Sequence, residues 1–162
     1  PTDLGELTES MLRGEEGHQA ADLEQLLGWL RRQPRPDVIC LSNALLVGLA
    51  RRLRTELHAP VACMLQGEDW FLDALPEPYR NRCWRIVAER AAELDQLIAP
   101  SRYFAALMSR RLGLPETAIA VVPNGIQLES YDAPPGPPPA AEHRVFGAVT
   151  IFTLKALAIK YE

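Results

Sequence analysis

The chain has 162 residues and a formal net charge of −4, with 48% hydrophobic and 23% charged residues. This length and composition favour a single soluble domain that buries its core without disulfides or metals. The isoelectric point near 5.5 argues against a nucleic-acid partner, because such proteins normally carry clustered lysine and arginine. Composition therefore narrows the partner classes but indicates no activity.

The three cysteines stand far apart, at Cys40, Cys63 and Cys83, and none forms a C-x-x-C pair. The sequence thus predicts neither a disulfide framework nor a metal site, and a reducing cytoplasmic location is the default expectation. The first residues have neither the basic start nor the apolar run of a signal peptide. The apolar run 145–159 is short for a membrane span and contains Lys155, so membrane contact is expected to be at most peripheral.

From residue 22 onward, short apolar runs alternate with segments of helical period, which is the pattern of βαβ units and a parallel sheet. The predicted helices carry apolar residues three or four positions apart, and the predicted strands are rich in Val and Ile. In chain order we expect helix 23–30, strand 38–41, helix 46–57, strand 61–65, loop 66–78, helix 84–94, strand 97–99, helix 104–112 and strand 118–122.

Cap signals accompany two of these helices. Asp22 and Gln25 have the spacing of a capping box at the first helix. Ser101 is placed to cap the helix that follows it, and Gly113 stands where a left-handed C-cap ends that helix. These signals set the expected helix boundaries.

The predicted fold class is α/β, a Rossmann-like open parallel sheet with helices on both faces. We expect residues 1–131 to form this domain and 132–142, which are rich in proline, to form an interdomain linker. The tail 143–162 is then interpreted as the start of a truncated second domain.

Ligands of open parallel sheets bind beyond the carboxyl ends of the strands, where helix N-termini also point. Polar residues follow each predicted strand at this position, and they are the candidate site. For acceptor binding the candidates are Asn43, Gln66, Gly67, Glu68, Asp69, Ser101 and Arg102, and for the hinge and cleft edge they are Asn124 and Gly125. Glu68 and Asp69 are carboxylates able to orient a hydroxyl group, although the sequence alone favours solvated loop or helix-capping roles for them. Ser101 as a plain helix cap and Asn124-Gly125 as a plain turn need no ligand either.

Four of these segments, taken together, resemble the family 4 glycosyltransferases. They occur in the family's order and spacing, over roughly residues 35–131. The segments are Pro36-Asp37-Val38-Ile39-Cys40-Leu41-Ser42-Asn43, Gln66-Gly67-Glu68-Asp69, Ile98-Ala99-Pro100-Ser101-Arg102-Tyr103 and Val121-Val122-Pro123-Asn124-Gly125-Ile126. The last is the most specific, because it is similar to the motif that closes the family's N-terminal domain.

The resemblance implies a two-Rossmann-domain enzyme that transfers a sugar from a nucleotide-sugar donor to a hydroxyl of an acceptor glycan or small-molecule alcohol. Members commonly retain anomeric configuration and need no metal, so no cofactor is expected beyond the nucleotide sugar as substrate. The N-terminal domain receives the acceptor and the C-terminal domain holds the donor. Glu68 and Asp69 would then be acceptor-loop residues.

Two departures from the family pattern shape the expectation. Residues 1–21 contain no Gly-rich opening. Residues 145–149 could form the first strand of a donor domain, but 150–162 do not resemble its continuation. We therefore expect a fragment that is inactive alone, with early strands missing. Such a fragment would receive a donor domain from another chain or self-associate through its unpaired sheet edge.

Two other classes of function remain open at this point. One is a non-catalytic α/β module that binds a glycan or a partner protein through the same crevice. The other is an unrelated nucleotide-binding α/β domain that shares only the alternating pattern, since fold alone does not fix function. Tight nucleotide binding by the isolated chain would favour the latter, and sugar binding without nucleotide would favour the former.

Overall fold

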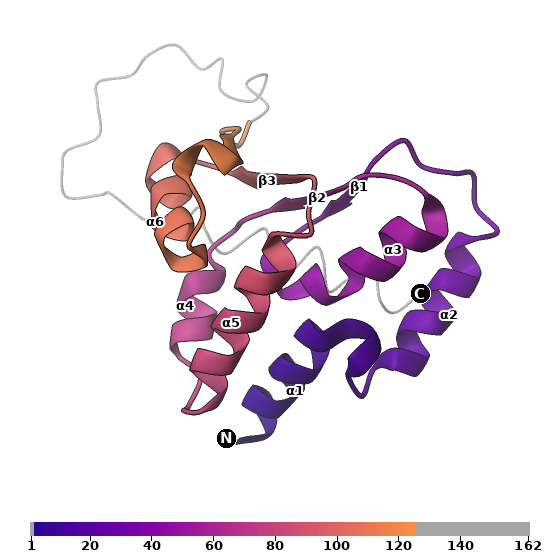
Figure 1. Cartoon of the computed structure of the whole chain (residues 1–162), viewed down its shortest axis with the longest axis horizontal. Helices are drawn as coiled ribbons and strands as arrows, with labels where there is room; N and C mark the ends of the chain where they lie inside the picture. The colour runs from indigo at the N-terminus through magenta and orange to yellow at the C-terminus, as the bar shows by residue number, and fades with distance from the viewer. Residues whose placement is uncertain (1, 126–162) are drawn as a thin grey trace, which may run out of the picture. The chain divides into compact units, whose positions relative to one another are not determined.

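The computed structural model describes residues 2–125, along which helices and strands alternate (Figure 1). The predicted linker 132–142 and tail 143–162 lie outside the described residues. In chain order the elements are α1 Thr2–Arg13, the 3₁₀ turn η1 Gly14–Glu16, α2 Ala20–Leu30, β1 Ile39–Leu41, η2 Ala44–Leu49, α3 Ala50–Leu57, β2 Val61–Met64, α4 Glu68–Asp73, α5 Tyr79–Ala91, β3 Gln96–Ala99, α6 Arg102–Leu112, η3 Glu116–Ala118 and β4 Ile119–Val121.

The four strands form one parallel sheet in the order β1-β2-β3-β4. Its register aligns Leu41, Cys63, Leu97 and Ile119 in a single row across the sheet, and all four side chains are buried. Such a row of apolar side chains is typical of a sheet face covered by other elements. The predicted α/β class and open parallel sheet are confirmed.

The helices that connect the strands cover the face on which this row lies. Leu53 of α3, Val87 of α5 and Met108 of α6 belong to the same hydrophobic cluster as the buried row. Consecutive parallel strands joined by right-handed crossovers place their connecting helices on one face. Figure 1 shows α3 and α5 on the same side of the sheet.

The opposite face of the sheet is less covered. The strand residues that alternate with the buried row include exposed Cys40 and the half-buried Met64 and Ile98. On the flanks of the sheet, Val38 is 57% exposed and Val122 is 54% exposed. The second helical layer of the expected arrangement is not found among residues 2–125. Within these residues β1 and β4 form the two sheet edges, and self-association through an edge stays a prediction.

Helix α1 was not expected from the sequence. Three of its apolar residues, Leu4, Leu7 and Met11, are 40% to 48% exposed, whereas Thr8 and Glu9 are buried together with Leu12. The side chain of Thr8 donates a hydrogen bond to the Leu4 carbonyl oxygen, and Arg13 pairs with Glu9 at 2.6 Å. The buried side of α1 is therefore partly polar, which hides the helix from a search for an apolar stripe.

The predicted helix caps and boundaries are confirmed at α6 and are wrong in part elsewhere. Ser101 accepts a hydrogen bond from the Phe104 N–H at 3.1 Å, and Gly113 has φ +67°, so both caps of α6 are confirmed. The capping box at Asp22 is wrong, because α2 begins at Ala20 and Asp22 lies in its first turn. The predicted loop 66–78 is wrong in part, since it contains α4, and the predicted helix 46–57 begins as the 3₁₀ turn η2.

The close approach of η2 to the end of α1 depends on Gly48. A Cβ at this position would lie 2.2 Å from the Met11 carbonyl oxygen and 2.8 Å from the Leu12 carbonyl oxygen. We expect Gly48→Ala to lower the free energy of unfolding by about 1–3 kcal/mol, as overpacking does. Gly28→Ala is the matched control, because a Cβ there meets nothing within 4 Å inside α2.

The Gly28→Ala control should stabilise the protein by about 0.5–1 kcal/mol, the ordinary gain of alanine over glycine in a helix. Urea unfolding followed by circular dichroism measures both variants. Equal midpoints for the two variants would show that η2 and α1 do not meet as the structure has them.

Candidate functional site

The polar residues predicted for the site lie along the edge of the sheet that is formed by the carboxyl ends of its strands, as distinct from the edge strands β1 and β4. Each follows the carboxyl end of a parallel strand, and the register of β2 and β3 aligns Met64 with Ile98. The sheet continues one residue further, because the Leu65 N–H donates to the Ile98 carbonyl oxygen at 2.8 Å. The segments after β1, β2, β3 and β4 therefore all begin at the same edge, as the topology predicts.

Glu68 is committed to the backbone at this edge. Its side chain is 4% exposed, and Oε1 accepts a hydrogen bond from the Ala44 N–H at 2.7 Å. Oε2 accepts from the Gln66 N–H at 2.8 Å. Burial raises the pKa of the Glu68 carboxyl, against the opposing effect of these hydrogen bonds. Glu68 thus joins the segments after β1 and β2, and its role in acceptor binding stays a prediction.

Asn43 and Ser101 both cap helical turns at this edge. The Asn43 side-chain oxygen accepts a hydrogen bond from the Leu45 N–H at 3.0 Å at the start of η2. Ser101 caps α6 in the same way. Their side-chain oxygens are engaged locally, although the exposed hydroxyl of Ser101 can still donate a hydrogen bond to a ligand.

Asp69 and Arg102 are the charged side chains of the set that the described contacts leave available. Asp69 is half-buried in the first turn of α4, and Arg102 is exposed at the first position of α6. Within residues 2–125, neither side chain makes a hydrogen bond or an ion pair. Gln66 and Gly67 are exposed in the loop before α4, and Gly67 has φ +87°, a left-handed conformation that favours glycine.

Asn124 and Gly125 are exposed after β4. Neither residue has a positive φ, so the left-handed turn that the Asn-Gly pair permits is not adopted at these positions. The hinge role predicted for them stays a prediction.

Comparison with known proteins assigns this sheet and its edge to a family. A model of Glycosyltransferase Family 4 matches residues 8–130, more than half of the chain. The chain belongs to glycosyltransferase family 4. Neither a curated protein nor a solved structure matched it.

Two residues of this family 4 chain were missed by the search for polar strand-end residues. Trp70 in α4 is 83% exposed, and Tyr103 in α6 is 76% exposed. Both stand directly after predicted site residues, Trp70 after Asp69 and Tyr103 after Arg102. A search for aromatic residues within six positions of a strand end would have found them.

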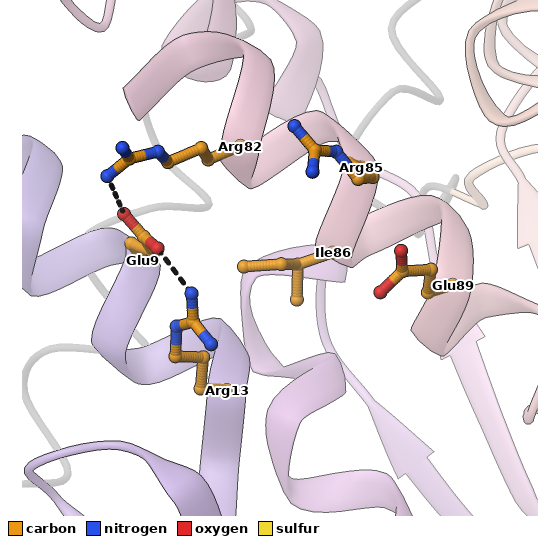
Figure 2. Close-up of a pocket in the computed structure, with 6 residues that line it drawn as sticks. All are labelled: Glu9, Arg13, Arg82, Arg85, Ile86 and Glu89. Atoms are coloured by element: carbon orange, nitrogen blue, oxygen red, sulfur yellow. Dashed lines mark hydrogen bonds and ion pairs between the residues drawn. The ribbon is translucent and has the colours of Figure 1, made fainter. Parts of the chain in front are cut away.

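A hollow of the family 4 chain lies elsewhere in residues 2–125. Its volume is about 500 Å³, and α1 and α5 supply all of its lining (Figure 2). Glu9 lies between Arg13 and Arg82, at 2.6 Å and 3.7 Å, which neutralises much of its charge. None of the predicted site residues lines this hollow, so we place the candidate site at the sheet edge instead. The lining residues are Glu9, Arg13, Arg82, Arg85, Ile86 and Glu89.

In the described part of the chain, no three His, Cys, Asp or Glu side chains are placed to hold a metal ion. Burial raises the pKa of the Cys83 thiol to about 11 and raises that of Cys63 still further, which makes both poor nucleophiles. No helix of residues 2–125 has the length and apolarity needed to cross a membrane.

Proposed function

We propose that this chain is the acceptor-binding part of an enzyme that transfers a sugar from a nucleotide-sugar donor to an acceptor hydroxyl. The observation that carries the proposal is the parallel sheet of a family 4 chain, which brings Asp69 and Arg102 to one edge with uncommitted side chains. The acceptor would bind beyond the carboxyl ends of β2 and β3, where open parallel sheets bind ligands. No cofactor is required besides the nucleotide sugar as substrate.

The chemistry needed from this part of the enzyme is positioning. The acceptor oxygen must lie close to the anomeric carbon of the donor, and holding the two reactants in that geometry supplies much of the rate enhancement. Asp69 would accept a hydrogen bond from an acceptor hydroxyl, and Arg102 would donate to a neighbouring oxygen. Stabilisation of the departing diphosphate would fall to the donor-binding part.

A non-catalytic glycan-binding role is the second candidate. The observation that favours it is the state of Glu68, whose two oxygens are taken by backbone N–H groups. This leaves Asp69 as the carboxylate at the edge that is able to orient a hydroxyl. The third class, an unrelated nucleotide-binding domain, is disfavoured by the family match.

Substitution of Asp69 tests the location of the acceptor. The full chain is incubated with methyl pyranosides, and binding is followed by saturation-transfer difference NMR. We expect Asp69→Asn to weaken binding about tenfold, because a carboxylate hydrogen bond contributes about 1.5 kcal/mol. Glu116→Gln is the matched control, since Glu116 is an exposed carboxylate at the opposite edge of the sheet, just before β4.

The two candidate functions are separated by a transfer assay on the same samples. The chain is supplied with UDP-glucose or GDP-mannose together with the pyranosides, and disaccharide products are sought by mass spectrometry. Products that decrease in the Asp69→Asn variant support the enzyme. Because the chain is proposed to be only the acceptor-binding part, the assay is repeated with a family 4 donor-binding part added as a separate chain, and binding without product in that mixture supports the glycan-binding module. If Asp69→Asn and Glu116→Gln bind alike, the acceptor does not lie at this edge.

A further inference from the structure

Trp70 and Tyr103 are the most exposed of the large hydrophobic side chains in residues 2–125. They are 83% and 76% exposed, whereas the other exposed members of this class lie between 37% and 57%. Burying an aromatic side chain removes about 150–250 Å² of surface from water, so leaving two in solvent forgoes a large stabilisation. Single exposed apolar residues are common, but two that follow neighbouring strands call for a physical reason.

The two rings emerge from neighbouring parts of the molecule. Trp70 is the third residue of α4, which follows β2, and Tyr103 is the second residue of α6, which follows β3. Strands β2 and β3 are paired in parallel, with Met64 opposite Ile98. Both rings are therefore carried by the first turns of helices that begin at the same edge of the sheet, beside Asp69 and Arg102.

Neither ring is needed for the hydrophobic core. The residue after each one is a phenylalanine, and Phe71 and Phe104 are partly buried and pack against the core cluster. Each helix thus directs one aromatic residue inward and the preceding one outward. The inward rings anchor the first turns of α4 and α6, which leaves the outward rings available to a ligand.

We propose that Trp70 and Tyr103 form an aromatic platform on which a pyranose ring of the acceptor stacks. A pyranose combines an apolar face of C–H groups with a rim of hydroxyls. The face fits the electron-rich surface of an aromatic ring, and the rim fits Asp69 and Arg102. The platform rests on the proposed function and narrows it, because a linear alcohol has no such face and would gain little from these rings.

Substitution of the two rings tests the platform in the full 162-residue chain. The probes are methyl β-D-galactopyranoside and methyl β-D-glucopyranoside, with glycerol as a linear alcohol, and affinities come from saturation-transfer NMR titrations. We expect Trp70→Ala and Tyr103→Ala each to weaken pyranoside binding about 3- to 10-fold, as lost aromatic contacts do. Trp70→Phe and Tyr103→Phe should retain most of it, and glycerol should bind equally poorly to every variant.

Trp29→Ala is the matched control. Trp29 is 52% exposed near the end of α2, an element that does not follow a strand of the sheet, so its loss should leave pyranoside binding unchanged. Equal effects of Trp29→Ala and Trp70→Ala would overturn the platform. The same holds if Trp70→Ala and Tyr103→Ala bind the pyranosides as the unsubstituted chain does.

Two further results separate the platform from the proposed function and from a membrane role. If Asp69→Asn weakens pyranoside binding and the aromatic variants do not, the acceptor site stands and the platform falls. If the unsubstituted chain binds glycerol but no pyranoside, the platform falls and the proposed function stands. If it binds neither, both fall. Tryptophan and tyrosine also favour membrane interfaces. Loss of co-sedimentation with phosphatidylcholine vesicles in the alanine variants, with pyranoside binding unchanged, would assign the rings to a membrane surface and overturn the platform.

Discussion

Replacing Arg90 with methionine should lower the free energy of unfolding by about 3 kcal/mol, because the substitution removes the cation from a buried charge cluster. The Arg90 side chain is 7% exposed and lies 3.5 Å from Glu93 and 3.8 Å from Glu15. It also donates a hydrogen bond to the Arg13 carbonyl oxygen at 2.7 Å, which ties α5 to the end of α1. Equilibrium unfolding in urea measures the loss.

The size of the Arg90→Met effect depends on how the charges of Glu15 and Glu93 are compensated. One buried oxygen each of Glu15 and Glu93, their Oε2 atoms, and the buried Nη1 of Arg90 have no hydrogen-bond partner among the described residues. The Arg90 Nη1 instead forms ion pairs with the two carboxylates. Arg51 also contacts both carboxylates, and its hydrogen bond holds the pKa of Glu93 below the ordinary value. Removing Arg90 leaves Arg51 as the remaining cation beside both carboxylates.

Arg51→Met and Arg90→Lys are the controls. Arg51 contacts the same two carboxylates from an exposed position, where solvent screens the interaction, so its loss should shift the urea midpoint far less. Arg90→Lys keeps the charge but not the planar fork, and should lie between methionine and the native residue. An Arg90→Met protein with a native midpoint would show that the cluster does not stabilise the fold.

Glu68→Ala should lower the free energy of unfolding by about 2–3 kcal/mol. The substitution removes the acceptor of two backbone N–H groups, those of Ala44 and Gln66, and each unsatisfied buried donor costs about 1–3 kcal/mol. The Gln66 N–H is partly accessible to water, so the total cost of the two unsatisfied donors lies near the lower end of the range that these values allow. Asp69→Asn is the matched control at the adjacent carboxylate and should unfold at a nearly native urea concentration.

Glu68 should also give stability a distinctive pH dependence. Because burial raises its pKa in the folded protein, the folded state keeps this proton at pH values where the unfolded chain has released it. The contribution of Glu68 is therefore fully present below the unfolded pKa of about 4.3 and is lost as pH rises through the raised folded pKa. Above that pKa it stays constant.

The comparison with Glu68→Gln isolates this dependence from other titrating groups. The difference in free energy of unfolding between the native chain and Glu68→Gln should decrease as pH rises from about 4.3 through the raised pKa. A difference that grows with pH would contradict a raised pKa. If Glu68 only joins backbone segments, folded Glu68→Gln should also bind pyranosides as the native chain does, in contrast to Asp69→Asn.

The alternation of apolar runs and helical periods was enough to predict the α/β class and all four strands, with boundaries within one residue of those observed. Period and length are local properties, and a parallel sheet follows from their order. The N-terminal helix was missed because its buried side carries Thr8 and Glu9 while Leu4 and Leu7 face solvent. Its position follows from packing against α5, which no local pattern records.

The candidate site was predicted in position but only partly in chemistry. Local sequence placed Asn43, Asp69 and Ser101 after strands, and the parallel topology brought those segments to one edge. The two neighbouring carboxylates looked equivalent in sequence. Their difference arises because Glu68 folds back to meet the Ala44 N–H, 24 positions earlier in the chain.

The sequence by itself determined the strand order along the chain, the caps of α6 and the family. Each depends on residue types at short, fixed spacings. Only the tertiary structure decided which carboxylate is buried, which aromatic rings stay in water and which face of the sheet carries helices. Those outcomes depend on contacts between segments distant in sequence, where burial and hydrogen bonding are decided by the whole packed chain.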